Sequence, residues 1–373
     1  KIKKPKKAAS IAVDQLGADD LVSLIVYDNN PEVLVQAKSL KTERDREDIK
    51  QRIQQIKPGG GTAIYGGVQL GADQVRRFIN REMVNRVILM SDGIANVGPS
   101  RTADLAELGK KLRKESMSVT TIGLGDDYNE DLMSALAEAS AANYYYVKDA
   151  EKLPSIFAEE IGAVRSIVAR SVTIQIKAPA GVKIKEILGH PEISCKDNAA
   201  QITLPEVFGS MKRRFLAKCE VTSESDEAKD VAAVDLQFED TETGKPASQS
   251  QNAKVKFTQE VAQSDKSMRQ EVVGNVLCWS NGESKKQAME LASAGKSKEA
   301  AEVLRSQIHY NSIVSKNLPA TPAAVADDNQ NLDAAAKDLE TRGRLEEGAV
   351  KQFKADNFLE RNGTRAGFSP GKN

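Results

Sequence analysis

Two short segments place an oxygen-bearing side chain directly after a turn or strand. Thr62 follows three consecutive glycines in IKPGGGTAIYGGV, which runs from Ile56 to Val68. Asp92 stands just after the apolar run VILM in NRVILMSDG. Hydroxyl and carboxylate oxygens suit a hard cation such as Mg²⁺, which takes few protein ligands and keeps several of its waters. Thr62 and Asp92 are therefore candidate metal ligands, provided that the fold brings their loops together.

Each segment also has an ordinary structural interpretation. Glycines allow positive φ angles and a close approach of the backbone, but they also occur in flexible turns. A Ser-Asp-Gly step is commonly a turn, and a Gly-Thr step is commonly a helix N-cap. Each signal is weak by itself, and the two are more specific together and in this order.

Other kinds of site are less well supported. PGGGTAIYGG lacks the Gly-Lys-Ser/Thr end of a phosphate-binding loop, and GLGDDY has Tyr128 where a dinucleotide fingerprint has its third glycine. His190 and His309 are far apart, and the cysteines form no CxxC or Cys/His cluster, so a structural zinc site is not predicted. No histidine, activated serine or paired carboxylates accompany Asp92, so we predict no catalytic residue and no enzymatic activity.

The composition excludes further classes. Lys plus Arg equals Asp plus Glu, 53 each, so the net charge of zero gives no reason to expect nucleic acid as a partner. The sequence contains no run of about twenty apolar residues, so no membrane span is predicted. With 373 residues, 40% of them hydrophobic, the chain has room for two or three domains.

The elements that would position Thr62 and Asp92 alternate along the first 168 residues. Compact apolar runs predict strands in DLVSLIVYD, EVLVQA, NRVILMSDG, SVTTIGLG and NYYYV. Amphipathic segments between and around them predict helices, among them PKKAASIAVDQL and TERDREDIKQRIQQI, the second capped at Thr42. The pattern predicts an α/β fold with a doubly wound, mostly parallel sheet. In such a sheet the glycine loop, the Asp92 loop and GLGDDYNE meet at the carboxyl ends of the strands.

The pattern of apolar and polar residues changes near Val168. Short alternating segments such as ARSVTIQIKAP and VAAVDLQFED predict an antiparallel β-sandwich-like domain over 169–262. A helical region is predicted over 263–359, in which KKQAMELASAGKSKEAAEVLRSQI is a helical hairpin and NLPATPAAVADDNQN a link. The remainder, 360–373, is predicted to be disordered.

Cys195 and Cys219 fall in separate strand-like segments of the sandwich-like region. We predict that they lie close together on neighbouring strands, and that an exported protein forms a disulfide between them. Two independent buried thiols are an equally good interpretation, because free cysteine behaves as a small hydrophobe.

The order of these blocks resembles the von Willebrand factor type A domain over residues 1–168. The resemblance rests on DLVSLIVYDNNPEVLV, IKPGGGTAIYGGV, VNRVILMSDGIANVG, SVTTIGLGDDYNEDLMSALAEAS and NYYYVKDAEKLPSIF. It implies a metal-ion-dependent adhesion site, in which Thr62 and Asp92 match the threonine of the second loop and the aspartate of the third. It also implies a non-enzymatic module whose protein partner supplies an acidic side chain to the bound magnesium.

The sequence departs from the family in one place. It contains no Asp-x-Ser-x-Ser loop, and KIKKPKKAASIAVDQL resembles the first helix of the domain. The resemblance therefore implies that the first strand and three of the five metal-site residues are missing from this chain. We expect it to bind magnesium weakly or not at all.

Beyond Val168 the chain resembles bacterial proteins often labelled calcium-activated chloride channel homologues, which implies an extracytoplasmic place in a bacterium. The main alternative to metal-dependent adhesion is a structural scaffold that binds partners without metal. A metal-dependent hydrolase is a third hypothesis, from a different class.

Overall fold

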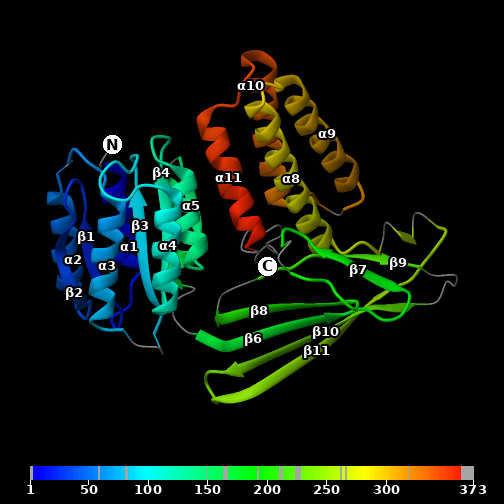
Figure 1. Cartoon of the computed structure of the whole chain (residues 1–373), viewed down its shortest axis with the longest axis horizontal. Coiled ribbons are helices and arrows are strands. Elements are labelled where there is room, and N and C mark those ends of the chain that lie inside the picture. The colour runs from blue at the N-terminus through cyan, green and yellow to red at the C-terminus, as the bar shows by residue number, and fades with distance from the viewer. Residues whose placement is uncertain are drawn as a thin grey trace. The chain divides into compact units, whose positions relative to one another are not determined.

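The computed structural model describes residues 3–57, 59–79, 83–148, 150–162, 167–190, 193–209, 213–222, 228–260, 263–264, 267–318 and 320–362. They belong to two compact units, Lys1–Ile167 and Val168–Asn373 (Figure 1). Each unit is described by itself. No helix among the described residues combines the length and the apolar character that crossing a bilayer requires.

The first unit alternates helices with strands. Its elements are α1 (Lys3–Gln15), β1 (Leu21–Val26), β2 (Glu32–Ser39), α2 (Glu43–Gln55), α3 (Ile64–Arg76), β3 (Asn85–Ser91), α4 (Thr102–Lys114), β4 (Met117–Leu124), α5 (Glu130–Ala139), β5 (Tyr144–Val147), η1 (Ala150–Lys152) and α6 (Leu153–Gly162). Strand β4 pairs in parallel with β3 on one edge and with β5 on the other. The predicted α/β class is confirmed.

Local sequence signals explain where these helices begin. Thr42 caps α2 as predicted: its hydroxyl accepts a hydrogen bond from the Asp45 backbone N–H, and the Asp45 carboxylate accepts one from the Thr42 N–H. Asn129 caps α5 by accepting from the Leu132 N–H at 3.0 Å. Strand β4 is buried along nearly its whole length, since all of its residues except Ser118 are buried. That burial accounts for its nearly continuous apolar and β-branched sequence.

The sheet of the first unit is interrupted between β1 and β3. Strand β1 pairs antiparallel with β2, β3 pairs with β4, and no ladder joins β1 to β3 within the described residues. A cavity of about 1250 Å³ lies between them. We call this cavity the groove. Within the described residues the fold thus has two half-sheets, β1-β2 and β3-β4-β5.

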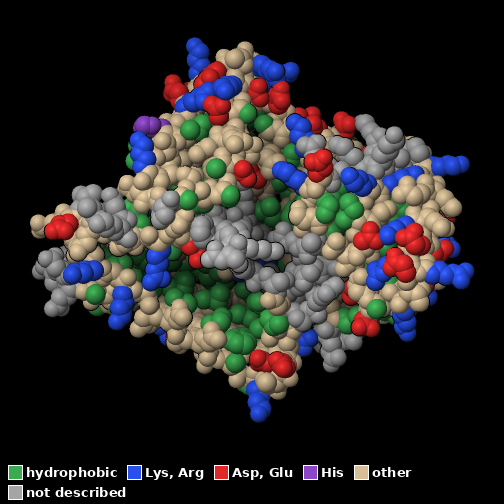
Figure 2. All heavy atoms as spheres, turned by 180° about the vertical axis from the view of Figure 1, so that it is seen from behind, with side chains coloured by type: hydrophobic (Ala, Val, Ile, Leu, Met, Phe, Trp, Pro, Cys, Tyr) green, Lys and Arg blue, Asp and Glu red, His purple; other side chains and the backbone are tan. Residues whose placement is uncertain are grey.

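Among the described residues the second unit contains a four-stranded sheet and a two-stranded antiparallel sheet. Its strands are β6 (Ile167–Lys177), β7 (Val182–Ile187), β8 (Ala199–Phe208), β9 (Ala217–Val221), β10 (Lys229–Asp240) and β11 (Lys245–Val255). The larger sheet has the order β11-β10-β6-β8, and β7 pairs with β9. Residues of both sheets, including Ile176, Ile184 and Ile202, form one apolar core. Seen from behind, apolar side chains gather over the larger sheet (Figure 2).

The two cysteines of the sandwich-like region lie in that same core. Cys219 is in β9, whereas Cys195 belongs to the irregular segment before β8, so the prediction of neighbouring strands is wrong for Cys195. Both thiols are free. Partial burial raises the pKa of the Cys219 thiol, and the nearby Cys195 raises it further.

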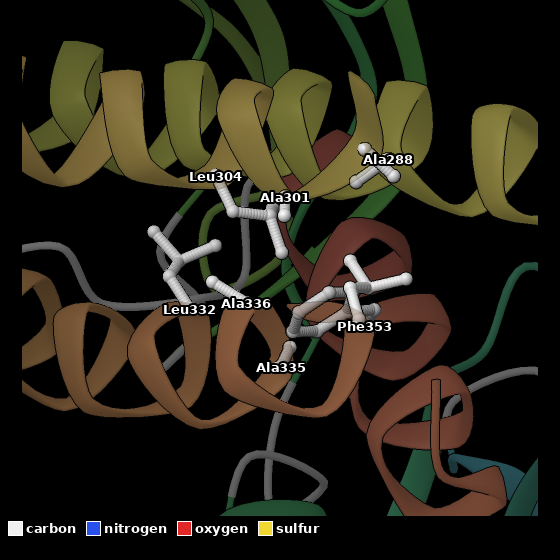
Figure 3. Packing of buried hydrophobic residues seen from close by; sticks show 9 residues of the cluster. Ala288, Ala301, Leu304, Leu332, Ala335, Ala336 and Phe353 are labelled. Carbon is white, nitrogen blue, oxygen red and sulfur yellow. The ribbon is translucent and has the colours of Figure 1, made fainter. Parts of the chain in front are cut away.

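Among its described residues, four helices complete the second unit, as predicted for this region. They are α8 (Gln270–Ser293), α9 (Ser297–Ser315), α10 (Ala323–Arg342) and α11 (Glu347–Arg361). Figure 3 shows their apolar core, in which Leu304, Leu332 and Phe353 meet small residues such as Ala336. The small alanines let the helices approach closely enough to exclude water from the larger side chains.

Two boundaries in this region differ from the predictions. The segment NLPATPAAVADDNQN was expected to be a link, but α10 already begins at Ala323. The predicted disordered tail begins at 360, but α11 continues to Arg361. The rest of that tail, 363–373, lies outside the described residues.

A polar network is buried among the same helices. The Lys285 ammonium of α8 donates to Asp328 of α10 and to Asp356 of α11, at 2.6 Å each. Beside it, the Gln307 amide accepts from Ser280 and Ser284, and it donates to Asn281 and Asn311. Because these groups are hydrogen-bonded to one another, their burial carries a smaller desolvation cost.

Candidate functional site

The structure brings the Thr62 and Asp92 loops together. Thr62 lies in the segment between α2 and α3, and Asp92 directly follows β3. The Thr62 backbone N–H donates to the Asn96 side-chain oxygen at 2.8 Å, and the Asn96 N–H donates to the Thr62 carbonyl at 3.3 Å. This reciprocal pair of hydrogen bonds holds the two loops side by side at the carboxyl end of β3.

Two of the three glycines before Thr62, Gly59 and Gly61, stand where a larger residue would clash with a neighbouring side chain. A Cβ on Gly59 would overlap the Asp28 side chain, and a Cβ on Gly61 would overlap that of Asn29. None of the three glycines has a positive φ angle. Their role is therefore a close approach of the glycine loop to the turn after β1, where the Ala63 N–H donates to the Asp28 carbonyl at 2.8 Å.

The Thr62 hydroxyl faces the turn that carries Asp92. Its oxygen lies 3.2 Å from the position that a Cβ on Gly93 would take. The same turn is stabilised internally, since the Ser91 hydroxyl donates to the Gly93 carbonyl at 3.1 Å. A hydroxyl and a carboxylate thus belong to adjacent, internally fixed loops, as ligation of a hard cation would require.

The third loop adds carboxylates but no nucleotide site. Asp126 accepts a hydrogen bond from the Tyr146 hydroxyl at 2.5 Å, whereas Asp127 is exposed. The Tyr128 ring packs against Gly123, where any Cβ would overlap it. Burial raises the pKa of the Tyr128 phenol, whose oxygen is hydrogen-bonded to that of Tyr144 at 2.7 Å. The ring occupies the space that a glycine would leave open, so GLGDDY does not form a dinucleotide loop.

One mouth of the groove is polar, and we call it the rim. It is formed by Asp28, Thr62, Asp92 and Asp127, which all line the groove. Tyr27 lies behind it and donates to the Met90 carbonyl at 2.5 Å. Burial raises the pKa of this phenol and the Asp92 charge raises it further, so Tyr27 is a neutral donor at pH 7.

The donor set of the rim is incomplete for a metal. Within the described residues no three His, Cys, Asp or Glu side chains gather in a way that could hold an ion. The rim offers one hydroxyl and dispersed carboxylates, whereas Mg²⁺ demands near-octahedral oxygen geometry. Both histidines belong to the second unit, where His190 packs against Phe215 with ring centroids 5.4 Å apart. Ligation by Thr62 and Asp92 stays a prediction.

Sequence reasoning missed the residues that hold the two loops together. Asn96 makes the reciprocal hydrogen bonds to Thr62, and its one signal is its position four residues after Asp92 in SDGIANVG. Asp28 and Asn29 set the requirement for glycine at 59 and 61. Such contacts join loops that are distant in sequence, so no local pattern shows them.

Comparisons with known proteins agree with this architecture. Residues 1–159 match the family model of the von Willebrand factor type A domain. An uncharacterized protein of Synechocystis sp. is 27% identical over 144 residues, which cover 39% of this chain and 33% of that protein. The uncharacterized protein YfbK of Escherichia coli K12 is 23% identical over 173 residues, 46% of this chain and 30% of YfbK. The matches thus span about a third of these relatives.

A solved structure shares the fold over nearly the whole chain. A von Willebrand factor type A protein from Catenulispora acidiphila superposes with a TM-score of 0.64 at 15% identity, covering 98% of this chain and 86% of that one. At this identity the likeness shows the fold alone.

Proposed function

The first unit of this chain is a von Willebrand factor type A domain, and from that premise we propose that the chain is a non-enzymatic, protein-binding module. Type A domains generally serve as interaction modules. The observation that carries the proposal is the rim, where the Asn96 hydrogen bonds hold the Thr62 and Asp92 loops side by side. The partner is a protein with an exposed acidic side chain, which completes the coordination of a magnesium ion at this rim.

Thr62 binds the ion through its hydroxyl, and Asp92 binds it directly or through a water. The free energy gained from coordination by two protein oxygens is too small to offset the cost of dehydrating Mg²⁺. This chain therefore binds the ion weakly or not at all. The resemblance implies that the remaining ligands belong to an Asp-x-Ser-x-Ser loop that this sequence does not include.

Titration calorimetry with MgCl₂ tests the metal part. We expect no saturable heat from the chain, and tight binding from a chain extended by a strand and an Asp-x-Ser-x-Ser loop. In the extended chain Asp92→Ala should abolish binding, and Thr62→Ala should weaken it without unfolding the protein. Tight binding by the unextended chain, lost in Asp92→Ala, would mean that another group such as Asp126 or Asp127 completes the site.

The second candidate function is a scaffold that binds its partners without metal. The incomplete donor set of the rim favours it. An immobilised glutamate-containing peptide, matched with a glutamine version, separates the two functions. Metal-dependent adhesion predicts that the extended chain binds only the glutamate peptide, and only with magnesium. Binding that persists in EDTA and is equally strong for the glutamate and glutamine peptides supports the scaffold.

The place of the protein in the cell is also a proposal. We propose an extracytoplasmic location in a bacterium, supported by the resemblance of the chain to bacterial proteins of this architecture. Fractionation of the native host with an antibody against the second unit tests it. Recovery of the protein in the cytosolic fraction would contradict this location.

A further inference from the structure

The larger sheet of the second unit ends in a strand with an open outer edge. Strand β11 is the outermost strand of this sheet, and among the described residues it pairs with β10 alone (Figure 1). All of its residues are exposed except Ala247, which is half-buried. The outward N–H and C=O groups of such a strand can form a ladder with a further strand, so this edge is a template for another chain.

The two edges of the sheet differ in how they are protected. Strand β8, at the other edge, carries Pro205 in its middle, which has no N–H to donate, and the charged Glu206 beside it. In β11 the stretch 247–253 contains neither proline nor charge, and the residues of these types lie near its ends, at positions 245, 246 and 254. Proline and charge in the middle of an edge strand prevent pairing with another chain. Their absence from the middle of β11 favours pairing there.

The sequence of this stretch is nearly the same in both directions about Ser250. It reads ASQSQNA. When a second copy lies antiparallel with the two Ser250 residues opposite each other, like residues meet: Ala247 faces Ala253, Gln249 faces Gln251 and Ser248 faces Asn252. Moving the centre to either glutamine would place alanine opposite glutamine instead. Because directly opposed side chains decide how well strands pair, β11 is complementary to itself in one register.

This register also keeps the two faces of the sheet aligned. Ser250 lies opposite Asp235 in the ladder with β10, and its hydroxyl donates to that carboxylate at 2.6 Å. The odd positions of β11 lie on the other face, with the apolar Val234 and Leu236 of β10. A two-fold axis normal to the sheet at Ser250 pairs even positions with even and odd with odd. The apolar face of one sheet therefore continues into that of the second copy.

The charges at the ends of β11 suit the same arrangement. Lys254 of one copy lies opposite Pro246 of the other, and Pro246 lies opposite Glu239 of its own β10. The Lys254 and Glu239 backbones are thus two strand spacings apart, about 10 Å, and their extended side chains can meet over the short proline. Lys245 lies opposite Val255, so no lysine directly opposes another.

We propose that β11 is a dimerisation edge, to which a second copy of this chain adds its own β11 in antiparallel orientation, with the Ser250 pair on the two-fold axis. The four-stranded sheets of the two copies then form one continuous sheet. The uncharged stretches exchange about six to eight backbone hydrogen bonds. A standard interface has roughly 20–30 residues a side, so this short edge makes a weak, reversible dimer. The proposal uses neither the rim nor a metal, so its failure leaves the proposed function untouched.

Sedimentation velocity of the whole chain in EDTA, over roughly 1 µM to 1 mM, tests the dimer. We expect a reversible equilibrium between monomer and dimer. Ser250→Lys places two lysines directly opposite each other and should weaken the dimer about fivefold or more. The matched control, Asn252→Lys, adds the same charge at an exposed position that faces Ser248, and it should change the affinity by less than about twofold.

A chain that stays monomeric up to the highest concentration would overturn the proposal and leave the edge to a strand of a different protein. Equal effects of the two lysine substitutions would also overturn it, because association would then depend on net charge or on another surface. Unchanged melting temperatures of both variants establish that the monomer is still folded.

Cysteine cross-linking tests the register without weakening the dimer. Under oxidised glutathione, Ser250→Cys should form a disulfide-linked dimer, because the two introduced thiols face each other across the axis. Ser248→Cys should not, because its two sulfurs lie about four residues, or roughly 13 Å, apart. A mixture of Ser248→Cys and Asn252→Cys should cross-link again. The unsubstituted chain, with its three native cysteines, is the blank. Equal cross-linking by Ser250→Cys and Ser248→Cys would contradict the proposed pairing.

Discussion

Single glycines decide how closely the loops of the rim can approach. A Cβ on Gly61 would overlap Asn29 and lie 2.8 Å from Val97, whereas a Cβ on Gly60 would meet only Asn29, at 3.8 Å. We expect Gly61→Ala to destabilise the first unit by about 1–3 kcal/mol through overpacking. Gly60→Ala, the matched control, should change the free energy of unfolding by less than about 0.5 kcal/mol. Thermal unfolding of both variants is the measurement, and equal melting temperatures would contradict the role assigned to Gly61.

Two glutamines that are equally buried should respond in opposite ways to loss of the amide. The Gln74 oxygen has no partner among the described residues, whereas the Gln307 amide makes four hydrogen bonds. We expect Gln307→Leu to cost roughly 2–3 kcal/mol, because it leaves buried partners unsatisfied. Gln74→Leu should be neutral or should stabilise the first unit by up to about 1 kcal/mol. Differential scanning calorimetry of the two variants measures these changes in stability. A large loss of stability in Gln74→Leu would show that the Gln74 amide is hydrogen-bonded.

At the scale of elements, the buried ammonium of Lys285 connects three helices. It contacts Asp328 of α10 and Asp356 of α11 from its place on α8. Removing one partner of a buried ion pair typically costs about 3–5 kcal/mol of stability. We therefore expect Lys285→Met to lower the free energy of unfolding of the second unit by that amount. The matched control is Lys286→Met at the exposed neighbouring residue. It should change the free energy of unfolding by less than about 0.5 kcal/mol. The single tryptophan of the sequence, Trp279, lies on α8, so urea unfolding followed by its fluorescence reports on this part of the protein.

Elements with strong local signals were predictable from the sequence, and those defined by distant contacts were not. The capping box at Thr42 and the apolar run of β4 are visible within a few residues. The start of α10 is not, because Pro322 and a cluster of polar residues resemble a loop. Asp328 is accommodated in the helix by hydrogen bonds from Asn281 and Lys285, which are far away in the sequence. For the same reason Thr62 and Asp92 were predictable as a pair from the order of the strands, but Asn96 was not.

At the scale of the whole molecule, the division into two units makes a prediction about stability. The first unit has its own core, which includes Leu105, Leu132 and Phe157. Removing residues 263–373 should therefore leave its thermal transition in place, within a few degrees of that in the full chain. Differential scanning calorimetry of the two forms checks this. If the cooperative transition of the first unit disappears with the helices, the two units share a core.

The interruption of the sheet also has a mechanical consequence. Helix α3 packs against β1 and β2 of one half-sheet and against β3 of the other, and Gly71 lies between Ile25 and Val87 from the two sides. Helix α3 is thus a shared support that bridges the groove between the two half-sheets. It begins just after Thr62, while Asp92 directly follows β3 of the other half-sheet. A change in the angle between the half-sheets would strain the hydrogen bonds between Thr62 and Asn96, which join the two loops.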